Sequence, residues 1–195
     1  VQEQWSSRFG GRQFLPNRLW MDGDKEFVPY DYKKFDCKDH LRTNIAFDFL
    51  NEKNDNKPFF LFMSYRAPHS FEGPIRDTLE YRARDWPDIE KAHAAKITLL
   101  DKQVGRLINK LKELGALENT LILFTSDNGP HCDKGGHDIE FFNSNGNLKG
   151  GKRDLYEGGI RVPMIAYWKN KIRPNSLSYH ISGFQDIIST FSEVI

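Results

Sequence analysis

Two adjacent side chains with oxygen atoms, Asp127 and Asn128, follow directly on a run of β-forming residues, 121–126. The run is typical of a buried strand, and Gly129 and Pro130 behind the pair are turn formers. In open α/β sheets, ligand sites lie beyond the carboxyl ends of the strands. A carboxylate beside an amide carbonyl suits a hard cation such as Ca²⁺. An Asx-turn that merely closes the strand is the alternative interpretation.

Two further polar residues could join the same site. His69 follows a second apolar run, residues 58–65, and Lys152 lies on the glycine-rich loop that leaves Asn128. A cation neutralises oxyanion charge, a lysine adds a point charge, and a histidine can donate a proton to a leaving oxygen. These parts are what a site for a tetrahedral anion needs. Each has an ordinary alternative, since His69 could cap backbone groups of its loop and Lys152 could be a solvated loop lysine.

Several residues with reactive side chains stay outside this constellation. His131 and His137 flank a glycine-rich stretch, where a histidine is more often a surface residue than a ligand, so neither is assigned a role. His93 falls on a predicted helix, where we expect it to pack or to form a hydrogen bond. Cys37 and Cys132, the only two cysteines, lie in no paired motif, and the sequence does not decide whether they form a disulfide.

The spacing of apolar residues predicts the elements that position these groups. Residues 89–114 carry apolar side chains at steps of three and four, which is typical of a long helix, and Gly115 is placed to end it. Residues 58–65 are almost continuously apolar, like a parallel strand that is covered on both faces. The remaining predictions are helices over 38–51 and 182–195, strands over 120–126 and 162–168, and a short hairpin around residues 21–24.

The order of strand, long helix and strand predicts a crossover unit, which is right-handed in nearly all proteins. The fold class is therefore α/β. Residues 129–151 have no apolar period, and a loop of that length inside a compact domain is usually functional.

Composition narrows the class of protein. The chain has 195 residues, enough for one domain with a sizeable core. Its 28 Lys and Arg residues balance 27 Asp and Glu residues, so the charge indicates neither a nucleic-acid nor a membrane-surface partner. No apolar run is long enough to span a bilayer. The 15 phenylalanines favour a packed globular fold over disorder.

Four segments, in the same order, resemble the sulfatase family. They are residues 59–69, the helix segment 99–107, and the two motif segments 124–130 and 148–163. The resemblance runs from about residue 20 to the C-terminus. Several ordered motifs at plausible separations are far more specific than any one of them alone.

The resemblance implies an alkaline-phosphatase-like α/β fold, with a mostly parallel sheet and helices on both faces. It also implies hydrolysis of sulfate esters and a bound Ca²⁺. Asp127 and Asn128 match the calcium ligands of the family. Lys152, four residues before Tyr156, matches a lysine that contacts the sulfate, and His69 matches a histidine that contacts the sulfate and can protonate the leaving alkoxide. The implied substrate is an aryl sulfate or a sulfated carbohydrate. The resemblance also implies that the protein is periplasmic, secreted or lysosomal.

Asn128 also helps to distinguish sulfatases from zinc phosphatases of the same fold. Zinc phosphatases that resemble it tend to carry a histidine at this position, and imidazole suits Zn²⁺. An amide carbonyl favours Ca²⁺, with Mg²⁺ as the alternative. The pair therefore favours a sulfatase over a phosphatase.

The nucleophile that the resemblance implies is not found in this sequence. That residue is formylglycine, made from the first residue of a Cys/Ser-x-Pro-x-Arg motif, and neither Cys37 nor Cys132 lies in one. The paired aspartates that complete the calcium shell of the family are also missing. We therefore expect residues 1–195 to be a partial catalytic domain, with an irregular connecting segment over 1–36 and an α/β core portion over 37–195. The nucleophile would then lie upstream.

The interpretation as a partial sulfatase domain has two consequences, and two other functions remain as alternatives. A partial domain should be inactive by itself, and its exposed sheet edge should favour self-association. The first alternative function is that of a phosphodiesterase or phosphoglycerol transferase of the same superfamily. The second is a non-catalytic homologue that binds sulfated glycans.

Overall fold

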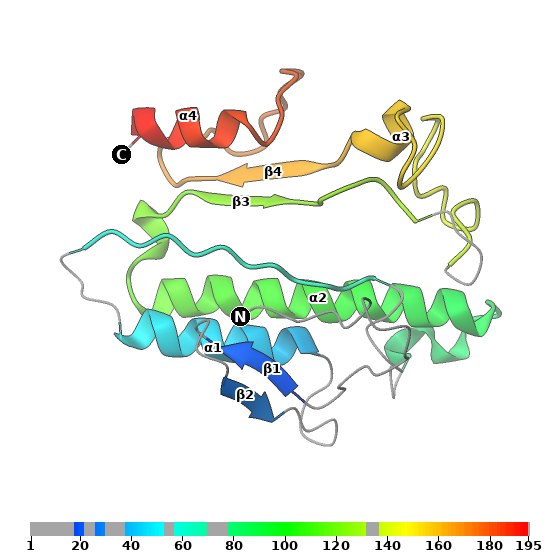
Figure 1. The fold of residues 1–195 in the computed structure, drawn as a ribbon, viewed down its shortest axis with the longest axis horizontal. Helices are drawn as coiled ribbons and strands as arrows, with labels where there is room; N and C mark the ends of the chain where they lie inside the picture. Colours follow the sequence, from blue (N-terminus) through cyan, green and yellow to red (C-terminus); the bar gives the residue numbers. More distant parts are fainter. Residues whose placement is uncertain are drawn as a thin grey trace.

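The computed structural model describes residues 18–21, 26–29, 38–52, 57–69, 78–131 and 137–194. Helices and strands alternate along this part of the chain, so the α/β class is confirmed (Figure 1). The elements in chain order are β1 (Arg18–Met21), β2 (Glu26–Pro29), α1 (Lys38–Glu52), the 3₁₀ helix η2 (Leu79–Ala83), α2 (Asp88–Glu113), the 3₁₀ helix η3 (Leu117–Asn119), β3 (Ile122–Thr125), α3 (Glu157–Ile160), β4 (Met164–Tyr167) and α4 (Asp186–Val194).

The long helix α2 forms where the apolar stripe predicts it, and it ends as its sequence dictates. Gly115 has a φ of 66°, in the left-handed region that glycine adopts without steric cost. Its amide donates to the carbonyl of Lys112 at 3.0 Å, and the amide of Ala116 donates to the carbonyl of Leu111 at 2.9 Å. This pair of hydrogen bonds is a Schellman motif, which satisfies the last carbonyls of the helix.

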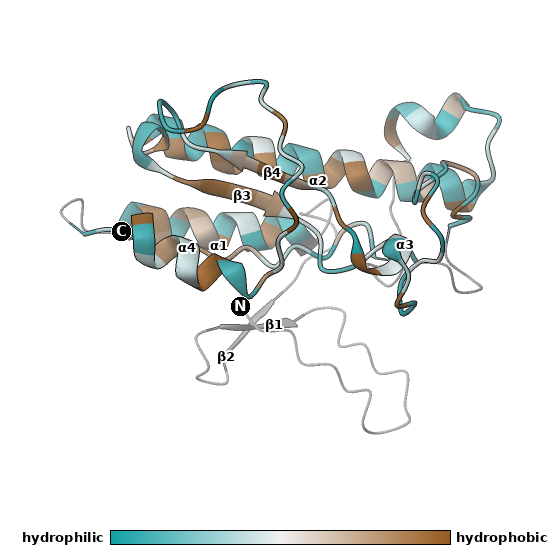
Figure 2. Ribbon diagram, turned by 90° about the horizontal axis from the view of Figure 1, so that it is seen from above, coloured by the Kyte–Doolittle hydropathy of each residue, from teal (hydrophilic) through white to brown (hydrophobic). Residues whose placement is uncertain are grey.

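Helices α1 and α2 pack against each other and contain most of the buried apolar residues. A hydrogen bond of 2.7 Å from Arg106 Nη2 to Asn44 Oδ1 links the two helices beside this core. Figure 2 shows that hydrophobic and hydrophilic residues alternate around α2, as expected for a helix with one buried face. The buried apolar side chains of the pair are Leu41, Ala46, Leu50, Ala94, Ala95, Leu99 and Leu111.

Both strand pairs in the described part of the chain are antiparallel. β1 pairs with β2, with Met21 opposite Glu26, which confirms the predicted hairpin. β3 pairs with β4, with Thr125 opposite Met164. The strand predicted over 120–126 is thus confirmed in a shorter form, and so are the strand over 162–168 and the C-terminal helix. Cys37, Cys132 and most of the segment predicted to be irregular lie outside the described residues.

Residues 58–65 do not form the predicted paired strand. They run as an extended segment between α2 and β3 in Figure 1, without a ladder to any described residue. Aromatic contacts hold the segment, since Phe59 meets Phe49 of α1 at 6.5 Å and Phe60 meets Phe191 of α4 at 5.9 Å between ring centroids. Phe60 and Phe62 are 70% and 79% exposed. The apolar run predicts burial on both faces, and described residues cover only part of it.

No helix in the described ranges is both long enough and apolar enough to cross a membrane.

Candidate functional site

The turn after β3 presents Asp127 and Asn128 at the end of the strand, as predicted. The hydroxyl of Ser126 donates to the backbone carbonyl of Asn128 at 3.2 Å. The side-chain amide of Asn128 donates to the carbonyl of Gly129 at 2.9 Å. Because that hydrogen bond uses the amide nitrogen, the oxygen of the same side chain remains the group that can accept or act as a ligand. The exposed carboxylate of Asp127 lies beside it.

Glycines bring three chain segments into direct backbone contact around this turn. The amide of Gly129 donates to the carbonyl of Gly159 at 2.9 Å, and the amide of Gly158 donates to the carbonyl of Lys149 at 2.8 Å. A Cβ atom at position 129 would lie 1.9 Å from the carbonyl oxygen of Gly158, and one at position 158 would lie 2.1 Å from that of Gly150. No side chain fits at these crossings, so the spacing of the glycines fixes the loops against the strand end.

A backbone hydrogen bond to Pro130 positions Lys152. Its amide donates to the carbonyl of Pro130 at 2.7 Å, so the loop folds back onto the turn that carries the Asp–Asn pair. Lys149 is directed elsewhere, because its ammonium lies 3.9 Å from the ring centroid of Tyr156. A cation over an aromatic face is held there by the ring quadrupole. The two lysines of the loop therefore have different surroundings: Lys152 follows a backbone contact with Pro130, and Lys149 lies over the ring of Tyr156.

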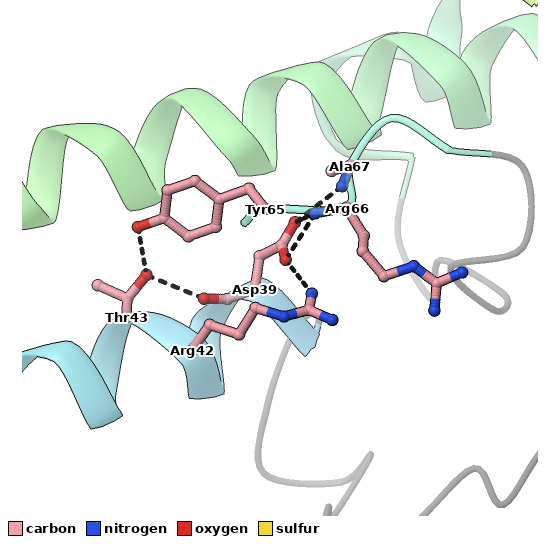
Figure 3. Close-up of polar contacts among 6 residues, drawn as sticks. All are labelled: Asp39, Arg42, Thr43, Tyr65, Arg66 and Ala67. Carbon is pink, nitrogen blue, oxygen red and sulfur yellow. Dashed lines mark hydrogen bonds and ion pairs between the residues drawn. The ribbon is translucent and has the colours of Figure 1, made fainter. Parts of the chain in front are cut away.

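His69 closes a turn at the end of the extended segment. Its amide donates to the carbonyl of Arg66 at 2.8 Å, and its carbonyl accepts from Lys96 Nζ of α2 at 3.2 Å. Figure 3 shows how α1 holds the start of the same turn: the carboxylate of Asp39 points at the amides of Arg66 and Ala67. The turn that carries His69 is thus attached to both helices.

Asp39 is a residue that reasoning from the sequence missed. Its side chain is fully buried, and it accepts hydrogen bonds from two backbone amides and from the guanidinium of Arg42 (Figure 3). The available signal was an acidic residue in the first turn of a predicted helix, three residues before an arginine. That pattern is common at helix starts, and only the fold shows that the carboxylate serves a different segment of the chain.

The other predicted residues act electrostatically on His69. The pKa of the His69 imidazole is lowered mainly by burial, then by the positive charges of Lys152 and Arg66 and by His131, while Asp127 raises it. The pKa of His131 is also lowered, by burial and by Lys152 and Arg153. A lysine and a carboxylate from two other segments therefore act on the charge of His69, and the neutral form of its imidazole is favoured.

The interpretation of His137 as a surface residue was wrong. The residue is only 8% exposed and stacks on His93 of α2 with 3.7 Å between ring centroids. Its Nδ1 lies 3.6 Å from a carboxylate oxygen of Glu90, which is 1% exposed, and the other oxygen of Glu90 accepts from the amide of Asp138 at 2.6 Å. The packing predicted for His93 is confirmed. A polar residue beside glycines resembles a surface loop in sequence, and only tertiary contacts reveal that α2 covers it.

The stacked histidines predict a dependence of stability on pH. Burial, His137 and Lys96 lower the pKa of His93 to about 4. Between pH 6.5 and 4 the unfolded chain takes up a proton at this position and the folded chain does not, so we expect the free energy of unfolding to fall as the pH falls through this range. The whole difference corresponds to roughly 3 kcal/mol, and partial exposure of the ring reduces the expected loss to about 1–2 kcal/mol.

Urea unfolding at pH 7 and pH 4.5 measures this effect. A His93→Phe variant keeps a ring against His137 but cannot titrate, so its loss of stability on acidification should be smaller than that of the wild type. The same change at the exposed His180 is the control and should leave the loss unchanged. His69 and His131 contribute in the same direction in every variant. An equal pH dependence in wild type and His93→Phe would contradict the assignment.

In the part of the chain that the structure describes, no three or more His, Cys, Asp or Glu residues are grouped so that they could hold a metal ion. Asp127 and Asn128 offer oxygen ligands only, which is the donor chemistry of Ca²⁺ and Mg²⁺ rather than of Zn²⁺. The pair fits part of the shell of a hard cation.

Comparison with known proteins identifies the family. The family model of the sulfatases matches residues 6–195, so this chain belongs to the sulfatase family. The chain is 33% identical over 181 residues to an arylsulfatase of Hemicentrotus pulcherrimus, a match that covers 90% of this chain and 29% of that protein. It is 35% identical over 173 residues to an N-acetylgalactosamine-6-O-sulfatase of Bacteroides thetaiotaomicron, with 83% of this chain and 30% of that protein covered.

Solved structures agree on the fold. The crystal structure of Ps i-CgsB in complex with k-i-k-neocarrahexaose superposes with a TM-score of 0.59 at 30% identity, over 75% of this chain and 29% of that one. A putative sulfatase of Bacteroides fragilis gives a TM-score of 0.53 at 28% identity, over 70% of this chain and 32% of that one. The fold is therefore the alkaline-phosphatase-like α/β fold of the sulfatases. This chain spans about three tenths of the length of each of these relatives.

Proposed function

We propose that this chain forms the sulfate-binding and leaving-group side of a sulfatase active site, in a protein that hydrolyses sulfate esters. The observations that carry the proposal are the 2.7 Å hydrogen bond that folds Lys152 onto the turn of Asp127 and Asn128, and the effect of the Lys152 and Asp127 charges on the pKa of His69. Family membership supports the reaction class, because it implies a metal-dependent hydrolase. Each of these residues also belongs to a sequence segment that resembles a motif of the family.

The roles follow from the chemistry of each group. The ammonium of Lys152 neutralises sulfate charge as a compact point charge. A neutral imidazole has one N–H donor, which His69 can direct at a sulfate oxygen or at the leaving oxygen. The hydrogen bonds that fix the backbone around both residues exist before substrate arrives, and preorganised groups cost no reorganisation during the reaction.

The cation would bind at Asp127 and Asn128. Asp127 and Asn128 would supply two of the six to eight oxygen ligands that Ca²⁺ takes, with Mg²⁺ as the alternative. A bound cation would supply a Lewis acid for the sulfate oxygens. None of the 195 residues lies in a Cys/Ser-x-Pro-x-Arg motif, so we propose that a formylglycine nucleophile comes from outside them. We also propose that the isolated chain is inactive, that it self-associates and that the protein is exported.

A sulfated carbohydrate is the substrate class that we propose. One relative is named for the 6-O-sulfate of N-acetylgalactosamine, and one superposed structure contains a neocarrahexaose. The test is to incubate the full-length protein with sulfated oligosaccharides, an aryl sulfate and a phosphate diester, and to measure released sulfate and phosphate. We expect sulfate release. Turnover of the diester alone would favour a phosphodiesterase, and binding of sulfated glycans without turnover would favour a non-catalytic homologue.

Cation binding can be tested without activity. A ligand that binds only the folded state at 100 times its Kd stabilises that state by about 2.7 kcal/mol. We expect Ca²⁺ to raise the Tm of the full-length protein, and Asp127→Ala to abolish most of that increase because it removes a charged ligand. Asp101→Ala, at an exposed position of α2, is the matched control and should retain the response. Equal stabilisation of the Asp127→Ala variant by Ca²⁺ would exclude this carboxylate from the metal site.

A further inference from the structure

We propose that Asp39 is a positioning residue for His69, acting through the backbone of residues 66–69, and that Lys96 supports it from the opposite helix. This inference rests on the proposed function, because it assumes that His69 serves the leaving group. It adds residues that lie outside the motifs of the site and that belong to α1 and α2 rather than to the strand ends.

Both oxygens of the Asp39 carboxylate are used in holding the turn. Oδ1 accepts from the amide of Arg66 at 3.1 Å and from the guanidinium of Arg42, and Oδ2 accepts from the amides of Arg66 at 3.2 Å and Ala67 at 2.9 Å (Figure 3). Hydrogen bonds to an ionised acceptor are about twice as strong as neutral ones. The carboxylate is fully buried, so water does not compete for these donors. It therefore fixes two consecutive amides just before His69.

The helix end that carries Asp39 is itself held in place. The hydroxyl of Thr43 donates to the backbone carbonyl of Asp39 at 2.9 Å and lies 3.0 Å from the hydroxyl of Tyr65 (Figure 3). Tyr65 immediately precedes the turn, so α1 holds the chain both before the turn and at its first two amides. A site supported on a helix is more precise than one carried by a loop alone.

The far end of the turn has its own attachment. Lys96 Nζ donates to the carbonyl of His69 at 3.2 Å, and Lys96 is on α2, which packs against α1. The two helices therefore hold the amide side and the carbonyl side of a single short turn. A displacement of about 1 Å in a reacting group can lower the reaction rate about 100-fold. Loss of either attachment should therefore lower the rate, because His69 would move.

The substitution Asp39→Asn tests this role. An asparagine has nearly the same size, but one of its two acceptor oxygens becomes an NH₂ group that faces the donors of the turn. We expect a 10- to 100-fold decrease in kcat for sulfate esters of poorly acidic alcohols and a much smaller decrease for aryl sulfates whose phenols are acidic. An acidic phenol leaves without a hydrogen bond from the N–H group of His69, so its ester does not need the correct position of the ring.

This dependence on the leaving group separates positioning from stability. A merely structural loss removes active protein and lowers the rates of all esters by one common factor. The same series of esters is measured in the full-length protein for His69→Ala, Asp39→Asn and Lys96→Met. The controls are Asp48→Asn on α1 and Lys102→Met on α2, both at exposed positions, and they should match the wild type.

Three outcomes decide the proposal. If the defects of His69→Ala and Asp39→Asn both grow as the leaving alcohol becomes less acidic, Asp39 is a positioning residue. If His69→Ala shows that dependence and neither Asp39→Asn nor Lys96→Met does, positioning by these residues is wrong while the proposed function stands. If His69→Ala itself shows no dependence on the leaving group, the proposed role of His69 is wrong and this inference is wrong with it. Lys96→Met keeps the test decisive if Asp39→Asn does not fold.

Discussion

Replacement of Lys152 by alanine should lower kcat/KM for sulfate esters about 10²- to 10³-fold in the full-length protein. Removing one preorganised group that stabilises transition-state charge costs about that much in other enzymes. The backbone of Lys152 is fixed on Pro130 at 2.7 Å, beside the Asp–Asn turn, and its charge reaches both His69 and His131. Loss of this cation should therefore weaken the interaction with the sulfate without moving the loop.

Lys149→Ala is the matched control for this prediction. The residue is on the same loop and carries the same charge, but its ammonium lies over the ring of Tyr156. A cation–π contact at an exposed site is worth about 0.5–1 kcal/mol, so we expect a small loss of stability and less than about a fivefold change in kcat/KM. Steady-state kinetics on one sulfate ester would measure both variants. Equal losses would show that the loop contributes charge collectively and that Lys152 has no specific role.

The difference between the two lysines was only partly predictable from the sequence. The spacing of Lys152 from Tyr156 singled it out by resemblance, but the ring contact of Lys149 depends on how the loop folds back. The turn after β3 was also only partly predictable. Local sequence fixes a β-strand followed by Asp127 and Asn128, because apolar β-formers give way to turn residues. The crossing of Gly129 with Gly158, by contrast, joins residues 29 positions apart and leaves no local signal.

Predictions from local sequence patterns were most accurate for features that depend on a single helix or turn. α2 begins one residue before its predicted start, and Gly115 ends it with the expected positive φ. They worked less well where distant segments meet. Residues 58–65 have the composition of a central strand, yet a ladder requires a neighbour at hydrogen-bonding distance, and no described residue supplies one. His137 and Asp39 were missed for a related reason, since each is buried by a segment far away in the sequence.

The second large effect concerns Gly129, where we expect alanine to destabilise the protein by about 3 kcal/mol or more. The added Cβ would lie 1.9 Å from the carbonyl oxygen of Gly158 and 3.0 Å from the Cα of Gly159. The obstructing atoms are backbone atoms and cannot rotate away, so the turn or the loop must shift. Overpacking of well-packed regions costs about 1–3 kcal/mol and occasionally more. The shift would also weaken the 2.9 Å hydrogen bond from the Gly129 amide to Gly159.

Gly105→Ala is the same chemical change, but we expect it to increase the stability of the protein. Gly105 lies in the middle of α2, and a Cβ atom there would meet nothing within 4 Å. Alanine in a helix interior is more stable than glycine by about 0.5–1 kcal/mol, so this variant should gain stability by that amount. Urea unfolding of wild type and both variants at neutral pH gives the comparison. A Gly129→Ala variant within about 1 kcal/mol of the wild type would show that the strand end and the 156–160 segment are not in the close contact that this site requires.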